Sequence, residues 1–411
     1  MGPHCFSKLV QKVLPITDMP KVLRIINRFN LGGPTYNVAY LSKYLAGYET
    51  LLVGGEKDES EDSSTFITSS LGLEPLIIEE MKRKIDPTQD IAAYKKIKNI
   101  INEFKPDIVH THASKAGTLG RLAAFSCKVP KVVHTFHGHV FHSYFGFAAT
   151  TFYKNIERFL AKRSDAIIAI SEKQKIELSE IHGICPQNKI SVIPLGFDLI
   201  KFNSNIEEKR ASFRKKYDLS DEIICIGIIG RLVPVKNHQL FLQALHQVTN
   251  KTSKKIKAFI VGDGELRDDL FNLCKTLGLT YSYVDQPNHS NQVIFTSWIK
   301  EVDHVLAGID VAALTSFNEG TPVSLIEAQA CNKPIVTTNV GGIENVVIPN
   351  ETALLCENNN LDEFTAALLR IVEDDELRNK MGVDGWKFVK DHFHYTRLCN
   401  DMKMLYDRLL I

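Results

Sequence analysis

Short runs of apolar, β-branched residues alternate with amphipathic segments along most of the chain. The runs of the first half read VLRIINRF, PDIVHTH, KVVHTFH, DAIIAIS and KISVIPLG, and those of the second half read EIICIGIIGRL, KAFIVGDGEL, QVIFTSW, DVAALTS, PIVTTN and ALLCEN. Strands that are apolar throughout are typical of parallel sheets covered by helices on both faces. The pattern predicts an α/β fold with two doubly wound, Rossmann-like domains that face a cleft, with ligands at the carboxyl ends of the strands.

One interruption of this alternation divides the chain. Residues 198–220 are charged and predict a linker with a first helix. We therefore expect a first domain over residues 19–197, a second over 221–385, and a C-terminal helix over 386–411. Residues 1–18 carry apolar side chains at helical spacing, with lysines between them. Such a segment packs on a protein face, stays disordered, or lies on a membrane surface as an amphipathic helix.

Composition narrows the class of protein. The chain has 411 residues, 44% hydrophobic and 24% charged, as expected of a soluble globular protein with two domains. Its formal charge of +1 gives no reason to expect nucleic-acid binding. The eight cysteines form no C-x-x-C pair, and no apolar run has the length of a membrane span. We expect a reduced, cytoplasmic protein without a signal peptide, disulfide framework or zinc site.

The most informative stretch is LTSFNEGTPVSLIE, where an apolar run ends. Glu319 and Gly320 lie on the expected turn, and Thr321-Pro322 opens a helix with proline at its first position. The N–H groups of a helix N-terminus attract an anion, while Glu319 and Glu327 suit the hydroxyl groups of a sugar. The motif predicts a sugar-nucleotide site, although an ordinary strand-to-helix junction has the same form.

A second motif follows the first strand of the second half. GIIGRLVPVK places Gly230, Arg231 and Lys236 at the carboxyl end of that strand. Arginine offers a planar fork to phosphate oxygens and lysine a mobile point charge. Taken alone the pair is also an ordinary surface pair, but beside Glu319 it predicts a diphosphate clamp.

A glycine pair marks the corresponding position near the amino terminus. Gly32 and Gly33 follow the first strand, and Pro34 opens the next helix. The loop allows a ligand to approach the backbone, and the helix N-terminus favours an anion. The third glycine of a dinucleotide fingerprint is missing, so the motif gives little support to NAD binding.

Histidines gather at two strand ends. His110 and His112 end one strand, with Lys115 close behind, and predict contacts to the phosphate of an acceptor. The stretch HTFHGHVFHSYF adds His134, His137, His139 and His142. No nearby acidic residue or cysteine completes a metal-ligand set, so we predict an imidazole that contacts sugar hydroxyls or the leaving phosphate. Loop-end histidines with internal hydrogen bonds are the alternative.

These motifs together resemble glycosyltransferase family 4, which has the GT-B fold, from about residue 20 to the end. The E-x7-E pair, the GRL-x3-K segment and the GDGELR loop occur in the family's order, and His137 matches its T-x-H-G motif. Family roles carry over by position. Arg231 and Lys236 would hold the donor diphosphate, Glu319 the sugar and Glu327 the ribose. His137 would lie at the transferred sugar.

The resemblance also extends to other parts of the chain. Gly32-Gly33 would close over the donor, and VGGIENVV, with Glu344, resembles the family's glycine-glycine loop. The first domain would bind the acceptor and the second the donor, while the C-terminal helix would cross back to the first domain. One departure is Ser297-Trp298, where the family often has glycine, which leaves the choice of nucleotide open.

The resemblance implies a retaining hexosyltransferase that needs neither metal nor other cofactor. It would move a hexose or N-acetylhexosamine from a nucleotide diphosphate sugar, UDP-linked in our prediction, to a glycan or a polyprenyl-diphosphate-linked acceptor in bacterial surface polysaccharide synthesis. Catalysis would be electrostatic, with Arg231 and Lys236 stabilising the departing diphosphate. A nucleotide-sugar epimerase, a phosphorylase and a non-catalytic nucleotide-sugar binder are the alternatives on the same fold.

An aromatic and basic segment suggests where the acceptor meets the protein. Residues 139–163 contain seven Phe or Tyr, followed by Lys154, Arg158, Lys162 and Arg163 at helical spacing. Such a surface suits a lipid-phosphate acceptor at the inner face of the cell membrane, where the protein would be peripheral. The alternative is that the aromatic residues belong to the core and the charges to a solvated helix face.

Overall fold

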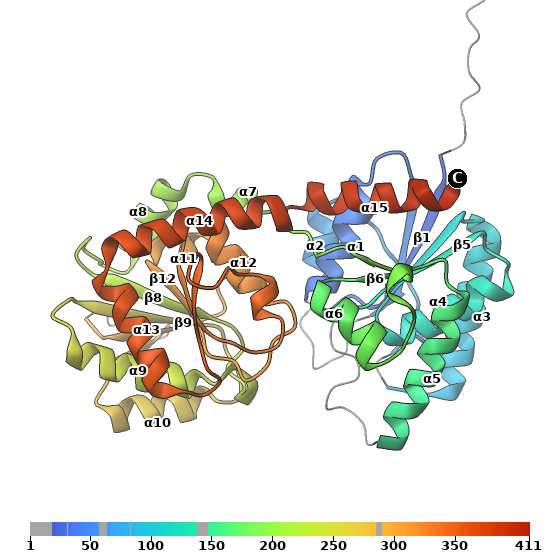
Figure 1. Cartoon of the computed structure of the whole chain (residues 1–411). Helices are drawn as coiled ribbons and strands as arrows, with labels where there is room; N and C mark the ends of the chain where they lie inside the picture. Colours follow the sequence, from blue (N-terminus) through green and yellow to red (C-terminus); the bar gives the residue numbers. More distant parts are fainter. Residues whose placement is uncertain (1–18, 31, 57–63, 83, 138–146, 285–289) are drawn as a thin grey trace, which may run out of the picture.

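The computed structural model describes residues 19–411 except 31, 57–63, 83, 138–146 and 285–289. Two α/β domains lie side by side, and the last two helices extend over both (Figure 1). Each domain is built on one seven-stranded sheet of parallel strand pairs. The predicted pair of doubly wound sheets is confirmed. The predicted amphipathic helix at residues 1–18 lies outside the described residues.

The first sheet has the order β3-β2-β1-β4-β5-β6-β7, which reverses between β1 and β4. Its strands are β1 (Lys21–Arg28), β2 (Glu49–Gly55), β3 (Leu76–Ile77), β4 (Ile108–His112), β5 (Lys131–Thr135), β6 (Ala166–Ala169) and β7 (Ile190–Val192). The helices beside it are α1 (Gly33–Tyr44), α2 (Thr65–Ser70), α3 (Pro87–Phe104), α4 (Ser114–Ser126), α5 (Phe147–Arg163) and α6 (Glu172–Ile176). Its central strands are buried, as their continuous apolar sequences predict.

The second sheet has the order β10-β11-β9-β8-β12-β13-β14, which reverses between β8 and β12. Its strands are β8 (Ile224–Ile229), β9 (Ile256–Val261), β10 (Tyr281–Tyr283), β11 (Val293–Ser297), β12 (Val311–Leu314), β13 (Ile335–Thr338) and β14 (Ala353–Cys356). The helices beside it are α9 (His238–Lys251), α10 (Arg267–Leu277), α11 (Val302–Gly308), α12 (Val323–Ala330) and α13 (Leu361–Glu373). Both sheets therefore have one point where the strand order reverses.

The segment predicted as a linker folds against the second domain. It forms α7 (Ile200–Asn203) and α8 (Ile206–Lys216). Phe202 and Phe213 are buried in the core that also holds Phe259 of β9. The apolar residues of this charged segment therefore extend the second core, and the chain has little free linker.

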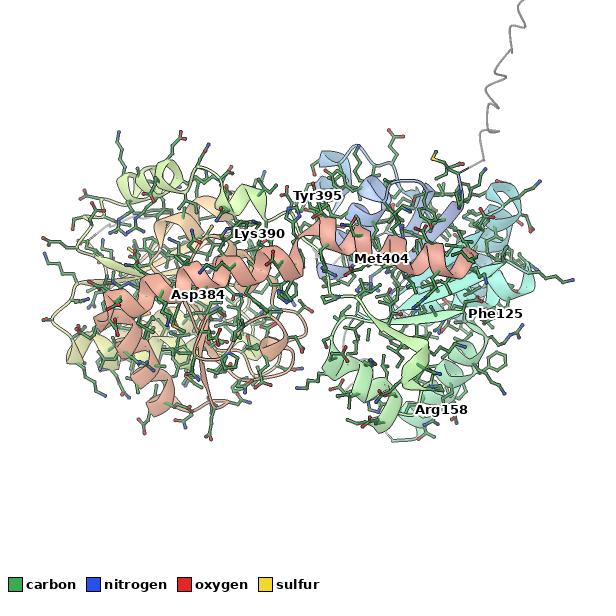
Figure 2. The ribbon with its side chains drawn as sticks, turned by 45° about the horizontal axis from the view of Figure 1, so that its top comes forward. Phe125, Arg158, Asp384, Lys390, Tyr395 and Met404 are labelled. Carbon is green, nitrogen blue, oxygen red and sulfur yellow. The ribbon has the colours of Figure 1, made fainter. Side chains whose placement is uncertain are left out.

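The C-terminal residues form two helices, α14 (Asp375–Phe393) and α15 (Tyr395–Leu410). In Figure 2, Asp384 and Lys390 lie on α14 at the second domain, whereas Met404 lies on α15 at the first. The crossing is tied to the earlier connection between the domains, because Phe197 N donates to Phe393 O (2.8 Å) and Tyr395 N donates to Phe197 O (3.0 Å).

Two further properties of the described residues concern membrane-spanning helices and cysteines. None of their helices combines the length and the apolar character that crossing a membrane requires. Their cysteines are all free thiols, most of them buried.

Candidate functional site

The reversal of strand order in the second sheet defines the candidate donor site. β8 and β12 are neighbours there, and their carboxyl ends carry the two loops that the sequence singled out. Gly230 and Arg231 follow β8, and Lys236 ends the short 3-10 turn over Pro234–Lys236. Glu319 follows β12. Ligands of open α/β sheets bind at such a reversal, because the loops on its two sides diverge.

An ion pair joins the two loops. Lys236 Nζ lies 2.6 Å from Glu319 Oε1, and both side chains are mostly buried. Ser316 Oγ donates to the same carboxylate oxygen at 2.6 Å, while Thr315 Oγ1 donates to Lys236 O at 3.1 Å. Arg231, by contrast, is exposed to solvent. The site thus has one oriented carboxylate, one cation in contact with it, and one cation at the surface.

Glycines fix the backbone of the Glu319 loop. Gly342 N donates to Glu319 O at 3.0 Å. A Cβ at Gly341, whose φ is +56°, would lie 2.0 Å from Glu319 O, and one at Gly342 would lie 1.9 Å from Gly320 O. Around Gly320 itself a Cβ would meet nothing within 4 Å. The VGGIENVV loop therefore needs glycine for packing, whereas Gly320 leaves open space in front of the backbone.

Helix α12 begins one residue later than predicted, because Pro322 is its N-cap and Val323 its first residue. No side chain caps this N-terminus, so its first N–H groups remain available to an anion. Glu327 lies on the second turn, where burial raises the pKa of its carboxyl to about 7. Asp303 raises that pKa further and Lys201 lowers it. The carboxyl therefore changes its charge near neutral pH.

The glycine-rich loops of the two domains come close together. A small pocket between the domains is lined by Gly320 and Thr321 on one side and by Ser171 and Leu195 on the other. Leu195 also borders Gly33, where a Cβ would lie 2.9 Å from Leu195 Cδ1. Gly32 precedes α1 at the equivalent strand end of the first domain. The structure thus brings the predicted donor residues of both domains to one region.

A hydrogen bond also crosses between the domains here. Lys173 Nζ, from α6 of the first domain, donates to Gly341 O of the second at 3.0 Å. The acceptor belongs to the loop that packs on Glu319. This contact ties the position of the donor loop to the first domain.

The histidines of the first domain divide into two kinds. His137 is half-buried, its Nε2 lies 2.9 Å from His112 Nδ1, and desolvation lowers its pKa to about 3. His110 is fully buried, with Nδ1 at 2.6 Å from the Tyr406 hydroxyl and Nε2 at 2.7 Å from Thr135 Oγ1. The prediction that His110 contacts an acceptor is therefore wrong, because both ring nitrogens already have partners inside the protein. His112 is equally buried and contacts His137.

Lys115 is also less available than its position suggested. Its ammonium lies 2.5 Å from Asp90 Oδ1 and donates to the carbonyl oxygens of Lys82 (2.9 Å) and Lys84 (2.6 Å). An acceptor phosphate would have to compete with these three groups. The predicted contact of Lys115 with an acceptor remains a prediction.

A pocket of about 480 Å³ lies at the carboxyl ends of β1 and β4, beside α5. Most of its exposed lining surface is apolar and comes from side chains such as Ile85, Leu119, Phe152 and Ile156. The lining also includes the charged residues Arg28, Asp90, Lys115 and Glu157. Phe152 is 61% exposed, and Phe159 on the same helix is 52% exposed. These two rings are therefore not core residues. The alternative to the membrane-facing prediction, which assigns the aromatic residues of this segment to the core, does not hold for them.

The basic residues of α5 are less uniform. Arg158 donates to Gly183 O, His182 O and Asn155 Oδ1, so it fastens the loop after α6. Lys162 and Arg163 are exposed, and the Arg163 guanidinium lies 5.6 Å from the centre of the Phe159 ring. Residues 138–146 of the aromatic segment lie outside the described residues.

No group of three or more potential metal-ligating side chains gathers within the described residues. His134 belongs to β5, where its Nδ1 lies 2.8 Å from Thr111 Oγ1. His139 and His142, which the sequence analysis weighed as ligands, lie outside those residues.

Ser297 stands where the resemblance led us to expect glycine, and its backbone has a conformation that favours glycine. Its φ is +53°, a left-handed value that favours glycine. Its hydroxyl donates to Asp263 Oδ2 at 3.1 Å, and its carbonyl accepts from Gly262 N at 3.0 Å. Serine therefore occupies this left-handed position, with its hydroxyl bonded to Asp263.

Comparisons with known proteins agree with this arrangement. The model of Glycosyltransferase Family 4 matches residues 32–201, and that of Glycosyl transferases group 1 matches residues 209–387. The UDP-Gal:alpha-D-GlcNAc-diphosphoundecaprenol alpha-1,3-galactosyltransferase of Escherichia coli is 32% identical over 80% of this chain and 82% of its own. The capsular polysaccharide biosynthesis glycosyltransferase CapM of Staphylococcus aureus is 26% identical over 80% of this chain and 84% of its own.

Solved structures show the same fold. Anabaena Alr3699/HepE in complex with UDP superposes with a TM-score of 0.77, at 18% identity, over 94% of this chain and 100% of its own. The lipopolysaccharide outer core galactosyltransferase WaaB superposes with a TM-score of 0.69, at 15% identity, over 94% of this chain and 99% of its own. The two facing domains of those proteins therefore have their counterparts here.

Proposed function

The chain belongs to glycosyltransferase family 4, a family of retaining hexosyltransferases with the GT-B fold, and we propose that it transfers a hexose or N-acetylhexosamine from a UDP-sugar to a lipid-linked glycan. Two named relatives support this reading. One takes UDP-galactose and a diphosphoundecaprenol-linked acceptor, and the other serves capsular polysaccharide synthesis. We place the protein in the synthesis of a bacterial surface polysaccharide, at the inner face of the cell membrane.

The observation that carries the proposal is the Lys236–Glu319 pair beside the uncapped N-terminus of α12. A diphosphate there meets the Lys236 ammonium, the exposed Arg231 and the helix N–H groups, which together stabilise the charge that grows on the leaving group. Glu319, oriented by Ser316, accepts hydrogen bonds from the sugar hydroxyls. His137 approaches the same sugar from the first domain.

Retention of configuration needs no protein nucleophile in this arrangement. As the bond between sugar and phosphate breaks, the acceptor hydroxyl attacks from the same face and passes its proton to a phosphate oxygen of the leaving UDP. Glu319 positions the sugar, and closure of the domains excludes water, the competing acceptor.

The apolar pocket between α4 and α5 is our candidate for the acceptor side. Lipid-linked acceptors join a sugar and a diphosphate to a hydrocarbon chain, so they need an apolar surface close to the catalytic loops. Ile85, Leu119 and Phe152 supply such a surface at the carboxyl ends of β1 and β4. Phe159 continues it towards solvent, where it would meet the membrane interface.

A donor screen tests the proposal. Purified protein is incubated with UDP-, GDP- and ADP-sugars and a polyprenyl-diphosphate-linked N-acetylhexosamine, and mass spectrometry detects lengthened glycan. We expect transfer from a UDP-sugar, with the anomeric configuration retained and activity kept in EDTA. Conversion of the sugar nucleotide without acceptor would instead identify an epimerase. Tight donor binding with neither hydrolysis nor transfer would identify a non-catalytic binder.

A further inference from the structure

A buried chain of contacts links the C-terminal helix to His137. The Tyr406 hydroxyl, on α15, lies 2.8 Å from Arg24 Nη1 and 2.6 Å from His110 Nδ1. The rings of His110 and His112 are in contact, with their centres 4.1 Å apart and their planes tilted by 35°. His112 Nδ1 in turn lies 2.9 Å from His137 Nε2. A residue close to the end of the chain therefore contacts, through two intermediates, the histidine expected at the transferred sugar.

Arg24 is an unusual member of this network. It is 0% exposed, and no carboxylate pairs with it among the described residues. Its donors reach the Tyr406 hydroxyl and, at 3.5 Å each, His110 Nδ1 and the Leu41 carbonyl, while Nε has no partner within the described part of the chain. A buried guanidinium without a counter-ion costs free energy of folding. Its presence on β1 is explained better by a role in the neighbouring site than by stability.

The hydrogen bonds favour one protonation state for His110. Arg24 can only donate, and its Nη1 faces both the Tyr406 oxygen at 2.8 Å and His110 Nδ1 at 3.5 Å, so an Nδ1 that accepts, with the Tyr406 proton directed to it, suits both neighbours. His110 then carries its proton on Nε2 and donates it to Thr135 Oγ1. The ring is neutral and held at both nitrogens, and it forms the surface on which His112 packs.

We propose that Tyr406 is a positioning residue of the active site, which acts through His110 and His112 to hold His137 in a fixed orientation and protonation state. The inference rests on the proposed transferase function. The outer nitrogens of the pair, His112 Nε2 and His137 Nδ1, have no partner within the described residues. One proton is shared between the two inner nitrogens, so one outer nitrogen donates and the other accepts. Both outer nitrogens are buried, and the contact between the two rings fixes which of them donates.

The surrounding charges agree with a neutral network. Burial, and then the charge of Arg24, lower the pKa of His110 well below its ordinary value. The pKa of His112 is also lowered well below its ordinary value, first by burial and then by its histidine neighbours and Arg24. The titratable and charged groups that face the network are Arg24 from β1, His110 and His112 from β4, His134 from β5, His137 from the loop after β5, Arg121 from α4 and Tyr406 from α15.

Two matched substitutions distinguish a role of Tyr406 in positioning the histidines from a role in docking α15 alone. Tyr406→Phe removes the hydroxyl that contacts Arg24 and His110. Tyr48→Phe removes a hydroxyl that donates to Asp407 on the same helix, at 2.6 Å, and that does not reach the histidines. We expect Tyr406→Phe to lower kcat roughly tenfold with an unchanged KM for the donor, and Tyr48→Phe to change kcat less than about twofold. Equal losses of kcat in the two variants, at similar melting temperatures, would overturn the proposal.

A second measurement uses the unaltered protein. In histidine-selective ¹⁵N spectra of the full chain we expect His110 as a neutral Nε2–H ring whose pKa lies well below its ordinary value. A His110 that titrates near its ordinary pKa of 6.5 contradicts the network itself. Because this spectrum needs no transfer reaction, failure of the network is distinguished from failure of the proposed function. If the wild type transfers no sugar while the spectrum is as expected, the function has failed and the network stands.

Discussion

The ion pair between Lys236 and Glu319 allows a quantitative test of the donor site. If Lys236 binds the diphosphate, Lys236→Met removes a cation and also leaves Glu319 as an unpaired carboxylate beside the phosphate. Two unit charges 4 Å apart interact by about 4 kcal/mol at an effective dielectric constant of 20. The Lys236 side chain is 22% exposed, so solvent reduces this value. We expect a loss of about 2–3 kcal/mol in UDP affinity, or roughly 30- to 150-fold in Kd.

Combining Glu319→Gln with Lys236→Met in a double variant then removes the unpaired carboxylate charge. The double variant should bind UDP more tightly than Lys236→Met alone and within roughly tenfold of the wild type. Isothermal titration with UDP measures both affinities, and because UDP lacks the transferred sugar, the proposed contact of Glu319 with that sugar does not enter. The matched control is the ion pair of Lys254 with the exposed Asp375, 2.7 Å apart at the opposite, amino-terminal edge of β9. The diphosphate assignment is wrong if Lys236→Met binds UDP within about twofold of the wild type, or if the double variant binds no better than the single one.

Three further predictions follow from other parts of the site. Because burial raises the pKa of Glu327 to about 7, donor affinity measured by titration should increase as pH rises through 7, and Glu327→Gln should remove this dependence. The same carboxyl should lower the free energy of unfolding as pH rises from 4.5 towards 7, since the native state binds the extra proton in that range. Gly342→Ala should lower both the melting temperature and the donor affinity, because its Cβ would lie 1.9 Å from Gly320 O. Gly320→Ala, whose Cβ meets nothing within 4 Å, should leave the melting temperature unchanged and weaken only donor binding. Equal melting temperatures of the two variants would contradict the packing argument. Phe152→Ser with Phe159→Ser should reduce sedimentation with anionic vesicles without changing donor hydrolysis, and a wild type that does not sediment at low salt would exclude the membrane-facing surface.

Most of the sheet architecture could be predicted because central parallel strands are buried on both faces and are therefore apolar throughout. The strands that escaped prediction were β2, β3 and β10. β3 has two residues, both exposed, and β10 has three, so neither carries a burial pattern. β2 ends in Gly54-Gly55, which reads as a turn although these glycines are needed for close packing against β1.

The site was predictable only where its residues follow a strand directly. Gly230, Arg231 and Glu319 could be placed at carboxyl ends from the local sequence alone. That Lys236 pairs with Glu319 depends on β8 and β12 becoming neighbours, which joins residues 83 positions apart. His110 is buried with Tyr406 as a partner, 296 positions away, and no local sequence pattern indicates that contact. Errors therefore concentrated where tertiary contacts decide the exposure of a polar side chain.

The crossing of α15 has a consequence for the order in which the protein folds during synthesis. The core of the first domain includes Leu398, Met402, Leu405 and Tyr406, which leave the ribosome after all the strands of both sheets. Burial of each aliphatic side chain contributes about 1.5–3 kcal/mol, so together they amount to a large part of the stability of a domain. The domain made first therefore waits for α15, while the second domain can complete its own core once α14 has emerged. A chain that has released α14 but not yet α15 would carry a finished second domain and an open first one, whose uncovered apolar face is the surface that a chaperone would bind.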